Sequence, residues 1–166
     1  MSGYRFMALI ALFTFALGLA LVGEAVAGEK VKFRDHFVGV KWEQIEVGDR
    51  EGHAIGLYQS KGVISNTEGK PFLDGWAETD SGLMDFDSKT WHGTGHGHEV
   101  LTDPDGDKIF IRWEGTTGPG GRGIHEIEGA TGKWQGIRGK GTYSARILSP
   151  VQWYVDVEMD IEFPRR

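Results

Sequence analysis

The stretch Val151-Gln-Trp-Tyr-Val-Asp-Val-Glu-Met-Asp-Ile-Glu-Phe163 decides the fold. Its odd-numbered positions are apolar, and its even-numbered positions from Gln152 to Glu162 are polar or, at Tyr154, amphipathic. Successive side chains of a β-strand point to opposite faces, so this alternation predicts a strand with one apolar and one wet face. At ~3.3 Å per residue the strand would span roughly 40 Å, about twice the usual length. A strand of that length must coil, and coiled antiparallel sheets tend to close.

The rest of the chain supplies partners for this strand. We expect strands within Val31 to Val47, Ala54 to Ile64, Phe72 to Phe86, Trp91 to Thr102, Ile109 to Glu114, Gly123 to Glu128 and Tyr143 to Leu148. A change of apolar parity in the first of these predicts a β-bulge. Asn66 to Gly69 reads as a turn, Asp80 to Gly82 as an interruption of its strand, and Asp103-Pro-Asp-Gly-Asp107 as a tight hairpin turn.

The strand count and the turn spacing define the fold class. About eight short-turned strands and no helical period predict an all-β barrel or sandwich. Glycines inside the strand-like segments favour an eight-stranded antiparallel barrel, because glycine lets strands coil sharply and lets backbones approach. We expect the residues of shared parity to be buried: Ile109, Ile111, Trp113, Val151, Trp153, Val155 and Val157.

The first 27 residues have the pattern of a secretory signal peptide. Arg5 gives a positive start, Met7 to Val22 is apolar, and Ala25-Val26-Ala27 is a small-residue cleavage site. We expect cleavage before Gly28, leaving 28–166 as a single barrel domain that is secreted or periplasmic and has no stable membrane anchor. The alternative is a retained anchor, because the apolar run approaches spanning length.

Composition excludes several classes of function. The chain has 166 residues, a formal net charge of −6 and no cysteine. Its charges are interspersed without a basic run, which argues against a nucleic-acid partner. The absence of cysteine excludes disulfides, thiol catalysis and lipid attachment through cysteine.

The glycine-rich phrase Gly129-Ala-Thr-Gly-Lys-Trp-Gln-Gly-Ile-Arg-Gly-Lys-Gly-Thr-Tyr143 resembles the signature of the allene oxide cyclase and dirigent barrel superfamily. The hairpin from Val100 to Glu114 is similar to the preceding part of bacterial barrels of this kind. The resemblance implies an eight-stranded antiparallel barrel, often a homo-oligomer, with an apolar cavity. It does not imply allene oxide cyclase chemistry, because that chemistry depends on a cavity cysteine.

The same phrase has an independent physical interpretation. Gly132, Gly136, Gly139 and Gly141 are too dense for a flexible linker that also contains Trp134. We expect a barrel corner in which at least one of these glycines has a backbone angle that other residues avoid. The alternative, a phosphate-binding loop, is disfavoured, because no P-loop lysine–serine/threonine pair follows and no helix start is visible.

Aromatic residues are the candidate ligand contacts. All six tryptophans lie after residue 27, and several tyrosines join them. Aromatic side chains fill cores and also line pockets for apolar ligands, so plain core packing is the alternative for each one. The ligand-binding candidates are Tyr58, Trp113, Tyr143 and Trp153.

Three histidines are the candidate metal ligands. His96 and His98 share one strand face, and the third donor could be His92, Glu99 after a bulge, or the distant His125 or His53. The alternative is a polar, solvated strand start. Asp103 to Asp107 with Glu114 has acids spaced like those of a calcium loop, but Lys108 stands where such a loop needs glycine, so we expect a hairpin there. No nucleophile motif indicates a catalytic residue, and no cofactor is implied.

These observations leave three functions open. The leading hypothesis is an exported, non-enzymatic barrel that binds a small apolar ligand or serves the cell envelope. The second is a cyclase-like or isomerase-like enzyme that acts on a hydrophobic substrate in the cavity, and the third is a histidine metal binder. A cavity lined only by apolar and aromatic groups would favour the first, whereas a buried carboxylate or histidine facing the cavity would favour the second.

Overall fold

The computed structural model describes residues 28–68 and 71–164. The predicted signal peptide therefore lies outside the described residues. Within the described ranges, no helix combines the length and the apolar character needed to cross a membrane.

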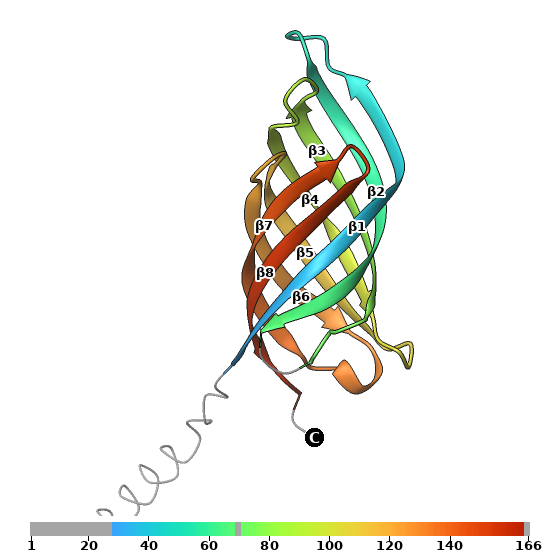
Figure 1. Cartoon of the computed structure of the whole chain (residues 1–166), viewed down its shortest axis with the longest axis vertical. Coiled ribbons are helices and arrows are strands. Elements are labelled where there is room, and N and C mark those ends of the chain that lie inside the picture. Colours follow the sequence, from blue (N-terminus) through green and yellow to red (C-terminus); the bar gives the residue numbers. More distant parts are fainter. Residues whose placement is uncertain (1–27, 69–70, 165–166) are drawn as a thin grey trace, which may run out of the picture.

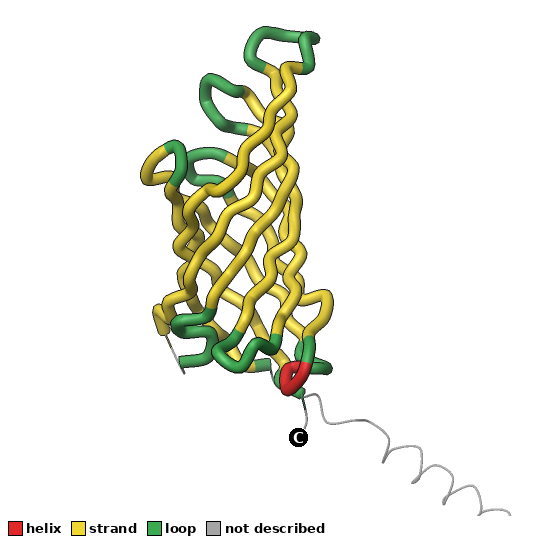
Figure 2. Tube along the Cα trace, turned by 90° about the vertical axis from the view of Figure 1, so that its right-hand side faces the viewer, coloured by secondary structure: helices red, strands yellow, loops and turns green. Residues whose placement is uncertain are grey.

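The described chain forms one closed antiparallel barrel of eight strands, as Figures 1 and 2 show. Each strand pairs with the next along the chain, and the last strand closes the barrel by pairing with the first. This confirms the barrel and excludes the sandwich. The strands are β1 (Glu29–Glu46), β2 (His53–Glu68), β3 (Ala77–Asp87), β4 (Gly93–Thr102), β5 (Lys108–Thr117), β6 (Arg122–Ala130), β7 (Arg138–Ser149) and β8 (Gln152–Glu162).

β8 has the two faces that its sequence predicts. Val155, Val157, Met159 and Ile161 are buried in the barrel interior, whereas the alternate acids face outward. Two of those acids pair with cations of β1 across the closing seam, in the contacts Lys30–Glu158 at 2.6 Å and Arg34–Asp156 at 2.7 Å. Burial of Ile109, Ile111 and Trp113 on β5 is also confirmed.

Two further residues that the sequence predicted to be buried, Val151 and Trp153, are not fully buried. Val151 is 55% exposed, because it lies in the turn between β7 and β8 and not in the strand. Trp153 is partly buried, with its ring 5.7 Å from that of Phe37. Its burial is incomplete because it lines a cavity, described below.

Three local predictions concern breaks in strands. The bulge in the first strand is confirmed, since the β1–β2 register shifts between Gly39 and Lys41. The turn predicted from Asn66 is wrong, because Asn66 pairs with Phe33 and Glu68 with Lys32, which continues the β1–β2 ladder. The interruption predicted from Asp80 is also wrong. β3 runs unbroken through it, because the Asp80 carboxylate accepts hydrogen bonds inside the barrel.

One end of the barrel is closed by an aromatic plug. Residues 71–76 before β3, residues 163–164 after β8 and the 3₁₀ helix η1 (Gly132–Trp134) meet there, at the lower end of the barrel in Figure 1. Rings of Phe72, Trp76, Trp134 and Phe163 pack edge-on or tilted at centroid distances of 4.9–5.5 Å. The plug closes this end of the barrel to solvent.

The glycine-rich phrase forms the corner beside this plug. Gly132 and Gly136 have φ angles of 51° and 88°, which confirms that the corner uses backbone angles other residues avoid. A Cβ at Gly132 would also overlap the carboxylate of Asp107. Asp103 anchors the corner by accepting from the Trp134 indole at 2.9 Å and from Lys133 at 2.6 Å. Burial acts to raise the pKa of Asp103, but these donors outweigh it and lower the pKa to about 2.

Candidate functional site

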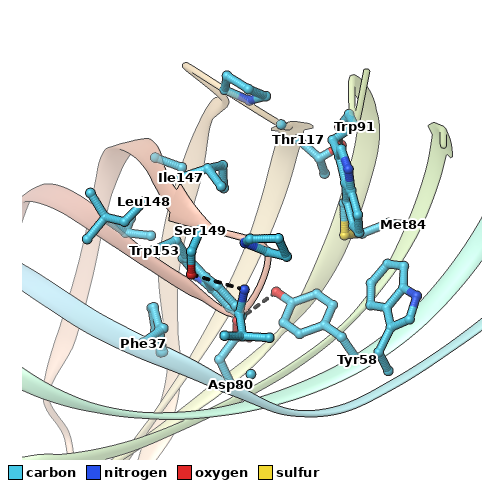
Figure 3. A pocket seen from close by; sticks show the side chains of 18 of the residues that line it. Phe37, Tyr58, Asp80, Met84, Trp91, Thr117, Ile147, Leu148, Ser149 and Trp153 are labelled. Carbon is cyan, nitrogen blue, oxygen red and sulfur yellow. Dashed lines mark hydrogen bonds between the residues drawn. The ribbon is translucent and has the colours of Figure 1, made fainter. Parts of the chain in front are cut away.

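The opposite end of the barrel holds a cavity of about 880 Å³. Its lining includes Trp91 before β4, Pro119 between β5 and β6, and Pro150 between β7 and β8, so its mouth lies among these turns. Figure 3 shows its walls and floor from close by. A volume of this size is in the range of pockets that enclose drug-sized molecules.

The four predicted ligand contacts all lie on the wall of this cavity. Tyr58, Trp113, Tyr143 and Trp153 come from β2, β5, β7 and β8. Tyr58 is in the middle, with its ring 6.3 Å from that of Trp113 and 6.0 Å from that of Trp153. Tyr143 meets Trp113 edge-on at 6.3 Å. The structure therefore brings these four residues together, and ligand contact by them stays a prediction.

Glycines of the neighbouring strands create the space that Trp113 occupies. A Cβ at Gly82 on β3 would come 2.5 Å from Cζ2 of Trp113, and a Cβ at Gly97 on β4 would come 2.8 Å from its Cε2. Both distances are shorter than side-chain packing allows. The inward positions of β4 at Gly95 and Gly97 thus carry no side chain, and the indole ring extends over them.

The same alternation turns the predicted metal ligands away from the cavity. His96 and His98 are exposed on the outer face of β4, and Nδ1 of His98 lies 3.3 Å from Oε2 of Glu128. His92 is exposed in the segment before β4. Within the described residues, the three histidines do not place their ring nitrogens together as a three-ligand group.

Asp80 lies at the floor of the cavity and is held by two donors. Tyr58 donates its hydroxyl to Oδ2 at 2.6 Å, and Trp113 donates its indole N–H to Oδ1 at 2.8 Å. Figure 3 shows the Tyr58 contact as a dashed line. Burial raises the pKa of Asp80 to about 6, against the lowering effect of the two donors. Asp80 therefore titrates close to neutral pH.

Glu99 and His125 form a second buried pair that lines the cavity. Oε1 of Glu99 lies 3.4 Å from Nε2 of His125, and the His125 ring lies 5.0 Å from that of Tyr143. Burial lowers the pKa of His125 to about 3, so its imidazole is neutral at pH 7. Burial and the nearby Asp35 and Asp80 raise the pKa of Glu99 well above its usual value. Burial therefore disfavours the charged form of both residues.

Beneath the floor lie two further acids. Oxygens of Asp35, Glu78 and Glu99 fall within 4.8 Å of one another, and all three residues are buried. Burial is the main cause that raises the pKa of Asp35 and of Glu78, with neighbouring carboxyls contributing. These oxygens are the donor type that hard cations prefer, and they are also placed to share protons.

Sequence reasoning did not predict this buried cluster of ionisable residues. It considered Glu99 and His125 only as alternative third ligands of the histidine metal site, and it missed Asp35, Glu78 and Asp80 as buried groups. The signal was present in the strand alternation. Asp35 stands on the same parity as Val31, Phe33 and Phe37, and Glu99 on the same parity as Leu101. An acid on the inward parity of a strand is rare unless it is paired or functional, and that rule identifies both residues.

Comparisons with known proteins support the fold. No protein-family model matches the sequence, and no curated protein matches it significantly. Among solved structures, a pterocarpan synthase dirigent protein superposes with a TM-score of 0.50 at 10% identity, covering 87% of this chain and 94% of that chain. The resemblance of the glycine-rich phrase to dirigent-like barrels is thus confirmed as a likeness of fold.

Two other solved structures are similar at lower TM-scores. One is a pyocyanin demethylase, with a TM-score of 0.46, 16% identity and coverage of 80% of this chain and 100% of that chain. The other is the Diels Alderase AbmU from Streptomyces koyangensis, with a TM-score of 0.44, 18% identity and coverage of 95% and 80%.

Proposed function

We propose that this protein binds a small, largely apolar molecule in its barrel cavity and catalyses proton transfer on it, as an isomerase or cyclase does. The observation that carries this proposal is the combination of aromatic walls with an ionisable floor. A protein that only carried its ligand would need the aromatic walls but not the ionisable floor. Asp80, Glu99 and His125 facing the cavity meet the criterion that favours the enzymatic hypothesis over the non-enzymatic one.

The floor contains groups in different protonation states, which is what acid–base catalysis requires. Asp80, with a pKa of about 6, is mostly ionised at pH 7 and can accept a proton. Burial raises the pKa of Glu99, which favours the protonated form that can donate a hydrogen bond. Two carboxyl groups whose environments set their pKa values apart can act as base and acid in one site.

The proton balance of such a step is simple. The Asp80 carboxylate takes a proton from one atom of the bound molecule and returns it to another atom. The protein ends the cycle as it began, and no oxidant or reductant is consumed. Tyr58 and Trp113 hold the carboxylate in a fixed orientation throughout, because each donates to a different oxygen. Positioning of this kind reduces the reorganisation needed in the transition state.

Binding without catalysis is the second candidate. Both oxygens of Asp80 already accept a hydrogen bond from the protein, as a purely structural buried carboxylate would. In that case the cavity stores or carries its ligand, and the ionisable floor serves only to orient it.

Binding is tested by filling the cavity. Ala145 lines the cavity, and Ala77 is exposed on the outside of β3. We expect the neutral fluorophore N-phenyl-1-naphthylamine to bind the wild-type protein and the Ala77→Phe control, and to lose at least about tenfold in affinity for Ala145→Phe. Equal affinity for all three proteins would show that the cavity is not the binding site.

Catalysis is tested by removing the titrating group. Once a turned-over substrate is found, Asp80→Asn should lower kcat by about 10²-fold or more, the usual contribution of a general acid or base. A Tyr58→Phe variant should have a smaller effect, because Trp113 still holds the carboxylate. Unchanged turnover in Asp80→Asn would leave the carrier function.

Export and self-association remain proposals from the sequence. The signal pattern before Gly28 supports a secreted or periplasmic location, and N-terminal sequencing of the exported protein tests it. A mature chain that begins at Met1 in a membrane fraction would support the retained anchor instead.

A further inference from the structure

We infer that the cavity selects a planar ligand bearing a positive charge, such as an N-alkylated heteroaromatic or an aromatic amine in its protonated form, and rejects anionic apolar molecules such as fatty acids. This inference rests on the proposed function, because it takes the cavity as the binding site. It deepens that proposal by naming the charge and shape of the ligand.

The first support is the sign of the charges inside the barrel. Besides Asp103 at the glycine-rich corner, four carboxylic acids of the described chain are buried, whereas no lysine or arginine of the described chain is buried. Lys41 contributes to the cavity lining, but its side chain is 57% exposed and pairs with Glu43 at 2.9 Å. Several cations of the barrel wall pair with acids on the outer face, as Lys30 does with Glu158 and Arg112 does with Glu126. The acids of the interior are Asp35, Glu78, Asp80 and Glu99.

An anionic ligand would meet this interior at a high energetic penalty. Its carboxylate would leave water and approach Asp80 and Glu99 with no cation to compensate. A fatty acid could be held only with its carboxylate at the mouth and its chain directed to the floor. That orientation would place apolar carbons against the Asp80 carboxylate. Of the groups that line the cavity, a carboxylate is the least suited to contact with hydrocarbon.

A cationic ring, by contrast, is complementary to both the aromatic walls and the acidic floor of the cavity. The Tyr58 ring lies 6.3 Å from that of Trp113 and 6.0 Å from that of Trp153, and its hydroxyl donates to the Asp80 carboxylate. Aromatic faces attract cations, and the attraction increases where water is excluded. The Asp80 carboxylate supplies the opposite charge at the floor. Aromatic walls with an acidic floor are therefore complementary to a flat, delocalised cation.

The environment of Asp80 makes this selectivity dependent on pH. The ionisable groups that interact electrostatically with Asp80 are all acids: Asp35 (β1), Tyr58 (β2), Glu78 (β3), Glu99 (β4) and Tyr143 (β7). His125 (β6) lines the same cavity, and the Trp113 indole (β5) donates to Asp80. None of them neutralises an Asp80 anion with a full positive charge, since His125 is uncharged. A cationic ligand would be the first full positive charge beside Asp80, so its affinity should rise as Asp80 ionises.

The test compares three two-ring probes that differ in charge: N-methylquinolinium, 2-naphthol and 2-naphthoate. Affinities are measured at pH 7.5 by quenching of the cavity tryptophans and by calorimetry. We expect N-methylquinolinium to bind at least about tenfold more tightly than 2-naphthol, and 2-naphthoate not to bind measurably. Lowering the pH to 5 should weaken N-methylquinolinium by several-fold and leave 2-naphthol unchanged.

Two variants test whether Asp80, at the floor of the cavity, causes the preference for a cationic ligand. Asp80→Asn should bring the affinities of the cation and the neutral probe to within about threefold of each other. Asp160→Asn removes an acid from the exposed face of β8 and should change nothing. The pH series on the wild-type protein gives an independent answer where Asp80→Asn folds poorly.

The outcomes separate this inference from the proposed function. Equal binding of the cation and 2-naphthol, or preferential binding of 2-naphthoate, would overturn the charge selectivity while the cavity remains a binding site. Failure of all three probes, together with no effect of Ala145→Phe on N-phenyl-1-naphthylamine, would overturn both.

Discussion

Trp113 on β5 donates its indole N–H to Asp80 on β3 at 2.8 Å, passing over the inner face of β4. The contact is made possible by Gly95 and Gly97, which present no side chain along the path of the ring. The histidine-glycine stretch from Gly93 to His98 looks flexible in sequence, but it is a strand whose inner face leaves room for the Trp113 ring. The glycines of β4, the position of Trp113 and the orientation of Asp80 form one structural unit.

The first prediction tests that unit through Gly97. A Cβ there would come 2.8 Å from both Trp113 Cε2 and the Gly82 backbone. Gly97→Ala should therefore lower the free energy of unfolding by about 2 kcal/mol or more, through overpacking. Gly129→Ala is the matched control, since its Cβ would meet only Phe110 at 3.7 Å. Chemical denaturation measures both, and equal stability of the two variants would contradict the assignment.

The second prediction concerns the pKa of Asp80. A hydrogen bond donated to a carboxylate favours the ionised form, so removing a donor raises the pKa. Trp113→Phe should therefore raise the pKa of Asp80 above its value of about 6. An NMR pH titration of carboxyl-labelled aspartate measures the shift. Trp42→Phe is the control, because the Trp42 indole donates to Gln44 and not to Asp80. An unchanged pKa in Trp113→Phe would show that this hydrogen bond is absent in solution.

The sequence predicted the barrel because alternation is a local property that each strand carries by itself. β8 shows this best, with apolar and acidic parities that match its inner and outer faces. β2 shows the limit. Its apolar side chains Ile55, Leu57 and Val63 face outward and are 42–48% exposed, whereas its inward positions include Ala54, Gly56 and Ser60. These small inward residues leave room for the cavity. In β2 the inward face therefore carries the small residues, and the larger apolar residues lie on the outer face.

The ionisable floor was harder to predict for a related reason. Asp80, Glu99 and His125 lie on three different strands and meet only when the barrel closes. Strand parity singles out Glu99, but Asp80 followed by serine and glycine resembles a turn. The aromatic candidates were easier, because a large side chain on a clean alternating strand faces the interior wherever that strand is placed.

The third prediction follows from the raised pKa of Asp80 in the folded state. Between pH ~4 and ~6 the folded protein binds more protons at Asp80 than the unfolded chain does, so this residue makes the protein less stable as the pH rises through that window. The shift from 3.8 to about 6 corresponds to at most about 3 kcal/mol above pH 6. Asp80→Asn should remove this pH dependence. Its stability relative to wild type should therefore be greater at pH 8 than at pH 4.

Thermal or denaturant unfolding across pH measures this difference. The comparison with wild type is needed because His125 changes the pH dependence of the free energy of unfolding in the opposite direction. Burial lowers its pKa to about 3, so the folded state binds fewer protons there, and His125 makes the protein more stable as the pH rises from about 3 to 6.5. The difference between the two proteins isolates Asp80 as long as His125 remains in both. A difference in stability that does not vary with pH would mean that the Asp80 pKa is not raised.

The last prediction concerns the corner glycine Gly136, whose φ of 88° is unfavourable for residues with a Cβ. The site is otherwise uncrowded, because an added Cβ would meet only Pro164 at 3.7 Å. Gly136→Ala should therefore cost on the order of 1–2 kcal/mol through backbone strain alone. Gly136→Asn should recover part of that loss, since asparagine tolerates positive φ better than alanine does. Thermal melts of both variants decide the matter. A neutral or stabilised Gly136→Ala, as expected for an ordinary β angle, would mean that the corner is not the strained turn that closes this end of the barrel.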